Sequence, residues 1–86
     1  MRITKSEIHG MFNRMIKTMM RHNPKLDYTN WQLDYVSCYG GYVVEQIGEN
    51  GGVSHPLGMR RRSAAEMYCS MLMVCNALEC LEYGVN

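Results

Sequence analysis

Three consecutive arginines stand directly before a predicted helix, at the end of a glycine-rich stretch that reads GENGGVSHPLGMRRRS over residues 48–63. A helix start carries unpaired backbone amides and the positive end of the helix dipole, and guanidinium groups bind carboxylates and phosphates through paired hydrogen bonds. The pattern therefore indicates an anion-binding site. We predict that the binding residues are Arg60, Arg61, Arg62, His55, Gly51, Gly52 and Ser63.

The arginines face the positive end of the helix dipole, which costs about 0.3–1 kcal/mol per exposed charge unless something negative lies nearby. Three sources of negative charge remain open. One is an acidic side chain of the same chain, with Glu45, Glu49 and Glu66 as the candidates. The others are the acidic surface of a protein partner and the phosphate of a ligand. Internal pairing or simple solvation of the arginines is the competing explanation, because weak surface ion pairs are common.

Residue types that carry out catalysis are scattered. Of the histidines, only His55 lies in the glycine-rich stretch, next to Ser54. Adjacent residues on an extended strand point to opposite faces, so these two side chains do not form a nucleophile and base pair there. No H-x-x-x-H motif, paired carboxylates or Walker loop is present. We predict a protein that is not an enzyme, with a hydrolase centred on His55 as the minor alternative.

The four cysteines contain no C-x-x-C pair, and three of them fall in an apolar stretch near the C-terminus. In such a stretch, cysteine behaves as a small hydrophobic residue. Cys69 and Cys80 return to the same face of a helix but lie three turns apart, which is too far for shared metal ligation or for a bridge within the chain. We expect no metal and no cofactor.

With 86 residues and a formal net charge of +1, the chain is predicted to form one domain, residues 1–86. Its charges are segregated, because residues 1–25 hold six Lys or Arg and one Glu, whereas residues 26–59 hold four acids and no base. The longest run without a charge, residues 67–78, is shorter than the roughly 20 residues that span a bilayer. The N-terminus lacks the features of a secretion signal. We expect a cytoplasmic protein without a membrane segment.

The first helix is predicted over about residues 5–22. Thr4 and Glu7 have the spacing of a capping box, and Asn23 and Pro24 end the helix. Apolar side chains follow the helical period and predict one core-facing stripe: Ile8, Met11, Phe12, Met15, Ile16, Met19 and Met20. On the opposite side, a second basic face within about 60° of arc consists of Arg14, Lys17 and Arg21.

The middle of the chain changes to a strand-like pattern. Strands are predicted over about residues 31–39 and 42–49, split by a tight turn at the glycine pair 40–41, and a third short strand is possible over residues 53–55. A two-residue turn would place Tyr39 opposite Tyr42. This part of the chain therefore predicts a two- or three-stranded antiparallel meander.

The last helix is predicted over about residues 64–83, with a capping box at Ser63 and Glu66. Apolar side chains cover most of its circumference, so it requires burial on more than one side. Two arrangements remain open. In the first, one side of the helix is exposed and binds a second copy of the chain, in a homodimer or higher homo-oligomer, or another partner. In the second, the helix is enclosed between the first helix and the sheet.

Two resemblances follow from these elements. The order helix, meander, helix, with Arg60, Arg61 and Arg62 opening the last helix, resembles the double-stranded RNA-binding domain, which presents basic residues at that helix start. The chain departs from that family where a Lys-Lys-x-Ala-Lys run and a histidine between the first two strands are usual. The resemblance implies a phosphate contact by the three arginines.

The methionine-rich composition and the stretch GGVSHPLG, followed by SAAEMY, are similar in style to small accessory proteins of bacteriophages and prophages. That resemblance implies a protein that acts in the host cytoplasm by binding a host or viral component, including host defence factors, without catalysis. The sequence as a whole predicts a small α+β binding domain whose arginine segment engages an anionic protein surface or a phosphate-bearing ligand. The alternative is an RNA- or DNA-binding module that uses Arg60, Arg61 and Arg62 together with the basic face of the first helix.

Overall fold

Two helices and a three-stranded antiparallel sheet make up the computed structural model of the chain, which describes residues 2–36, 40–58 and 60–83. In chain order the elements are α1 (Lys5–His22), β1 (Trp31–Val36), β2 (Gly41–Ile47), β3 (Val53–Ser54) and α2 (Ala64–Tyr83). The predicted α+β class is confirmed, the third strand is present, and both helices have their predicted bounds. β2 begins one residue earlier and ends two residues earlier than predicted, and β3 ends one residue earlier, whereas residues 37–39 of the predicted first strand lie outside the described residues.

The register between β1 and β2 differs from the predicted one. Tyr42 lies opposite Tyr35, not opposite Tyr39, and every predicted pair is displaced by four residues along β1. The predicted register depends on a two-residue turn at Gly40 and Gly41, whereas in the structure Gly41 already belongs to β2 and lies opposite Val36. A shift by an even number keeps each side chain on its predicted face, because side-chain direction alternates with a period of two.

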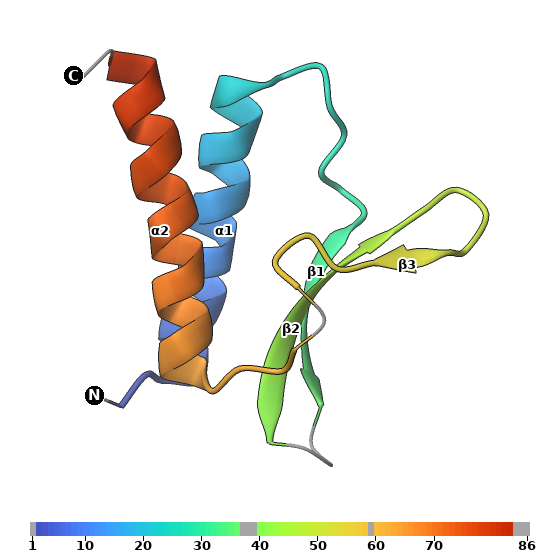
Figure 1. The fold of residues 1–86 in the computed structure, drawn as a ribbon, viewed down its shortest axis with the longest axis vertical. Coiled ribbons are helices and arrows are strands. Elements are labelled where there is room, and N and C mark those ends of the chain that lie inside the picture. Colours follow the sequence, from blue (N-terminus) through green and yellow to red (C-terminus); the bar gives the residue numbers. More distant parts are fainter. Residues whose placement is uncertain (1, 37–39, 59, 84–86) are drawn as a thin grey trace.

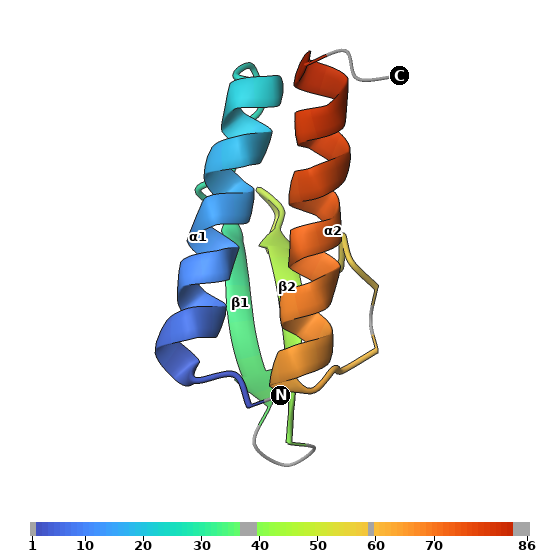
Figure 2. The ribbon, with the colours of Figure 1, turned by 90° about the vertical axis from the view of Figure 1, so that its left-hand side faces the viewer.

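The two helices lie side by side on one face of the sheet and run in the same direction (Figures 1 and 2). Both begin at the lower end of Figure 1 and end at the top. The chain returns to this lower end through residues 55–62, and this segment pairs with β2 at Tyr42. There Tyr42 N donates to the carbonyl of Arg62 at 2.7 Å, and Arg62 N donates to the carbonyl of Tyr42 at 2.9 Å. This bridge fixes where α2 starts.

The core lies between the helices and the sheet. Its fully enclosed members come mainly from the facing sides of the two helices, and β2 contributes one side chain. They are Ile8, Met11, Met15, Val44, Met67, Met71 and Cys75. The first helix forms as predicted: Glu7 N donates to Thr4 Oγ1 at 3.1 Å, and Thr4 N donates to Glu7 Oε1 at 3.2 Å. The predicted apolar stripe of α1 faces the core, except that Met20, near the end of the helix, is half exposed.

The second helix packs on α1 and β2 with one side only. Its opposite side carries a row of exposed residues that we call the outer stripe: Cys69, Met73, Asn76, Ala77 and Cys80. Met73 is 71% exposed. The helix is therefore not enclosed between α1 and the sheet. Within the described chain, the stretch Ala64–Leu81, with a mean hydropathy of 1.2, is the one helical segment whose length and composition would also suit a membrane span, a property that core helices of soluble proteins share.

Candidate functional site

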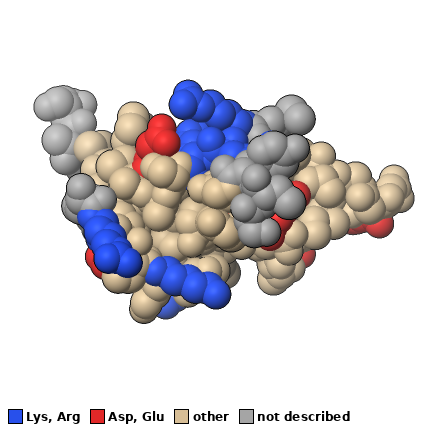
Figure 3. Space-filling view, turned by 90° about the horizontal axis from the view of Figure 1, so that it is seen from below, with Lys and Arg blue, Asp and Glu red and all other residues tan. Residues whose placement is uncertain are grey.

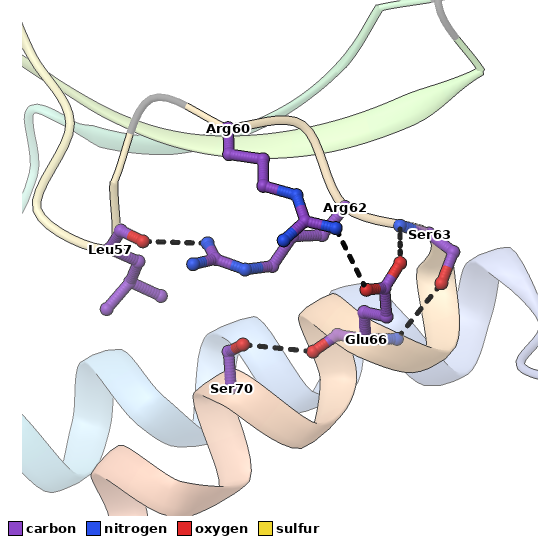
Figure 4. Close-up of polar contacts among 6 residues, drawn as sticks. All are labelled: Leu57, Arg60, Arg62, Ser63, Glu66 and Ser70. Carbon is purple, nitrogen blue, oxygen red and sulfur yellow. Dashed lines mark hydrogen bonds and ion pairs between the residues drawn. The ribbon is translucent and has the colours of Figure 1, made fainter.

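Of the three arginines before α2, Arg62 is used by the fold itself. Its Nη1 donates to the carbonyl oxygen of Leu57 at 2.7 Å, so the side chain reaches back across the 55–62 segment (Figure 4). Gly58, with φ of 99°, turns the chain close to this guanidinium. Arg62 therefore holds the segment in shape, and its guanidinium already has a hydrogen-bond partner within the chain.

Arg60 is directed outward from the fold. Its side chain is 79% exposed, and its Nη2 lies 3.9 Å from Glu66 Oε2, whose side chain is 55% exposed. An ion pair at this distance between two exposed groups contributes at most a fraction of a kcal/mol. Arg61 is also exposed. The arginine segment is thus divided into one structural residue and two residues on the surface.

The start of α2 is capped from within the chain, as predicted. Glu66 N donates to Ser63 Oγ at 3.2 Å, and Ser63 N donates to Glu66 Oε1 at 3.2 Å (Figure 4). These hydrogen bonds with Ser63, with a smaller contribution from Arg60 and Arg62, lower the pKa of Glu66 below its usual range. Ser63 therefore acts as a helix cap, and the Glu66 carboxylate already supplies one negative charge at this helix end.

The lowered pKa of Glu66 predicts an acid-dependent contribution to stability. A carboxylate whose pKa is lower in the folded state stabilises the fold above its unfolded pKa of about 4.3, and this contribution is lost as the pH falls through the folded value. In the wild-type protein, we expect the free energy of unfolding, measured with urea, to decrease between about pH 5 and pH 3. In Glu66→Gln this decrease should be smaller. Glu49→Gln, in the exposed β2–β3 loop, is the control for removal of a carboxylate. Equal slopes for wild type and Glu66→Gln would contradict the assignment.

The other predicted site residues do not gather around Arg60. Gly51 and Gly52 lie in the loop between β2 and β3, which projects away from the helices (Figure 1). His55 Nε2 lies 3.9 Å from Glu45 Oε2, whereas Ser54 Oγ donates to the carbonyl of Gln46 at 3.4 Å. The serine is thus directed to the backbone of β2, and the pair does not have the geometry of a nucleophile and its base.

The basic face of α1 is separate from the arginine segment. Arg14 Nη2 lies 3.2 Å from Glu79 Oε1, an ion pair that links the two helices. Arg21 is in the last turn of α1, at the opposite end of the molecule from the start of α2 (Figure 1). The two basic surfaces therefore do not form one continuous patch.

A pocket that the sequence did not predict lies at the lower end of the molecule. Lys5 and His9, from the first turns of α1, and Tyr35 and Tyr42, from the facing strands, line a cavity of about 240 Å³. The two tyrosine rings meet edge to face, with centroids 4.9 Å apart and planes at 61°. Lys5 and His9 are four residues apart, so the sequence alone places them on one face of the helix. The tyrosine pair depends on the register of β1 against β2, which was predicted wrongly.

The parallel helices concentrate positive charge at this same lower end. The positive ends of both helix dipoles lie there, together with Arg2, Lys5, Arg60 and Arg61, which we call the cationic end. The capping carboxylates Glu7 and Glu66 offset only part of this charge. Figure 3, which looks at this end, shows Lys and Arg side chains in separate groups, with Asp or Glu side chains next to some of them and uncharged surface between the groups.

Within the part of the chain that the structure describes, no three His, Cys, Asp or Glu side chains lie close enough to hold a metal ion. Comparisons with protein-family models, with curated proteins and with solved structures found no match to this chain.

Proposed function

We propose that this protein is a small binding protein without catalytic activity, and that its cationic end engages a phosphate-bearing ligand or the anionic surface of a partner. The observation that carries the proposal is the convergence of two helix starts and four cations at one end of an 86-residue domain whose formal net charge is only +1. Two helix dipoles and exposed guanidinium and ammonium groups attract anions to the same end of the molecule. Relative to the sequence prediction, the proposed site keeps Arg60 and Arg61 and gains Arg2 and Lys5. It no longer includes five predicted residues: Gly51, Gly52, His55, Arg62 and Ser63.

The pocket favours a ligand that carries a ring as well as a phosphate. One edge of the Tyr35 and Tyr42 pair is open to solvent beside Lys5. A cavity of about 240 Å³ suits one ring or one phosphate group rather than a whole drug-sized molecule, for which about 300–1,000 Å³ is usual. Stacking of a base on an aromatic side chain contributes about 1–3 kcal/mol. These features support the second candidate function, binding of a nucleotide or of single-stranded nucleic acid.

The test is a binding titration of charge variants that are matched in charge but differ in place. Lys5→Gln with Arg60→Gln removes two positive charges from the cationic end, whereas Lys17→Gln with Lys25→Gln removes two charges elsewhere. The probes are a labelled single-stranded oligonucleotide, a labelled RNA duplex and a labelled acidic peptide, each followed by fluorescence anisotropy at several salt concentrations. We expect the first variant to weaken binding by at least about tenfold, since each charged hydrogen bond contributes about 1.5–3 kcal/mol.

The outcomes separate the candidates. For a nucleic acid, the salt dependence should also decrease by about 0.7–0.9 log units for each phosphate contact removed. Tyr35→Ala should then weaken binding of the single strand and leave binding of the acidic peptide unchanged. Equal losses in the two charge variants would show that overall charge, and not the cationic end, is responsible. Absence of binding to all three probes would overturn the proposal.

The resemblance to phage accessory proteins is compatible with this function, and we propose a host or viral component in the cytoplasm as the partner. Purification from the native host, with mass spectrometry of what is retained, identifies that partner. Loss of the same component from the variant Lys5→Gln with Arg60→Gln connects it to the cationic end.

A further inference from the structure

The outer stripe of α2 is an unusually apolar surface for so small a domain. It contains no Lys, Arg, Asp or Glu, and Met73, at its centre, is 71% exposed. Leu81 flanks the stripe at the C-terminal end of the helix and is 68% exposed. Small soluble domains seldom leave a row of this kind uncovered unless it takes part in an interaction.

We propose that the outer stripe binds the outer stripe of a second copy of the chain, with the two α2 helices antiparallel. This inference is independent of the proposed function. The stripe reads nearly the same in both directions: at 100° per residue, Cys69, Met73, Asn76 and Cys80 fall within about 60° of arc. Their common midpoint lies between residues 74 and 75. A two-fold axis at this midpoint places Cys69 opposite the second copy's Cys80 and Met73 opposite its Asn76, as a self-complementary interface requires.

The charges of the helix ends favour the antiparallel direction. Arg60, Arg61 and the positive end of the dipole lie at the start of α2, where Glu66 offsets one positive charge. Glu79 lies near the end of α2, where it also pairs with Arg14, and α2 contains no basic residue. Antiparallel packing puts the acidic end of one helix beside the basic start of the other. Parallel packing would put like charges and like dipole ends together.

The structure also favours a second copy over a membrane as the occupant. The side of α2 opposite the outer stripe carries Met67, Met71 and Cys75, which are fully buried in the core. Insertion of α2 across a bilayer would remove these side chains from their partners in α1. Adsorption on an anionic bilayer surface usually involves Lys or Arg on the helix, and α2 has none.

The native cysteines provide a test of both the contact and its direction. Cys69 and Cys80 are exposed free thiols, whereas Cys75 is buried and burial raises the pKa of its thiol, so it should react slowly. The full chain with Cys38→Ser serves as the background, and mild oxidation with copper phenanthroline is followed by non-reducing electrophoresis. We expect a covalent dimer in this background, no dimer after Cys69→Ser or Cys80→Ser alone, and recovery of the dimer when these two variants are mixed.

The other outcomes are equally defined. A covalent dimer in either single variant would indicate parallel helices and overturn the antiparallel arrangement. Analytical ultracentrifugation provides the test without oxidation: we expect a species of twice 9.9 kDa, with a dissociation constant on the order of micromolar, that Met73→Lys converts to monomer. Met20→Lys, at a half-exposed site on α1, is the control. A wild-type protein that stays monomeric at millimolar concentration would overturn the proposal. Binding to lipid vesicles in a flotation assay, lost in Met73→Lys, would also overturn it.

Discussion

Replacement of Met71 by alanine should lower the free energy of unfolding by about 2–5 kcal/mol, the range measured for truncation of large buried side chains. Met71 is fully buried at the contact between α2 and α1. A domain of 86 residues has a total stability of roughly 4–13 kcal/mol, so the loss is a large part of the whole. Because methionine packing adapts easily, we expect a value in the lower half of the range.

Urea unfolding followed by circular dichroism measures this change, and the thermal midpoint should fall by roughly 10 °C or more. Met20→Ala is the matched control, since it makes the same substitution at a side chain that is 50% exposed. Its effect should stay within about 0.5 kcal/mol. Equal effects at the two positions would show that Met71 does not lie in the core as described.

The second large effect is expected for Arg62→Ala, at about 1–3 kcal/mol. The substitution leaves the Leu57 carbonyl, in a partly buried position, without the charged donor that now lies 2.7 Å away. The 55–62 segment should open locally, so the amide of Gly58, which donates to the carbonyl of His55, should exchange faster with solvent.

Arg60→Ala is the control for this variant, because it removes the same side chain two residues earlier. Its guanidinium is 79% exposed and makes only a 3.9 Å ion pair, so the stability should hardly change. Ligand binding should respond in the opposite way, with the larger loss for Arg60→Ala once the data are corrected for unfolded protein. If Arg60→Ala destabilises the fold as strongly as Arg62→Ala, the assignment of a structural role to Arg62 and a binding role to Arg60 is wrong.

The helices and their caps, which depend on residues close together in the sequence, were predicted well. Both capping boxes, at Thr4 and Ser63, form as expected. The helix bounds follow from these caps and from the apolar period, which are interactions within one or two turns. The same local signals placed all three strands, although β2 and β3 end earlier than predicted.

The register of β1 against β2 could not be fixed in the same way. A pair of glycines indicates a turn, but the number of residues in the connection depends on how the two strands pack on the helices. The displacement by four residues brings Tyr35, not Tyr39, to Tyr42. The tyrosine pair in the pocket with Lys5 was therefore missed.

The sequence by itself determined the helices, their caps, the three strands and a row of arginines before α2, because each depends on contacts between residues close together in the chain. Only the tertiary structure decided which arginine is structural, that the two helices run in the same direction, and which face of α2 stays exposed. The backbone bridge between Tyr42 and Arg62 is responsible for much of this, since it returns the chain to the end where α1 begins. Such a bridge joins residues twenty positions apart, and local periodicity contains no information about it.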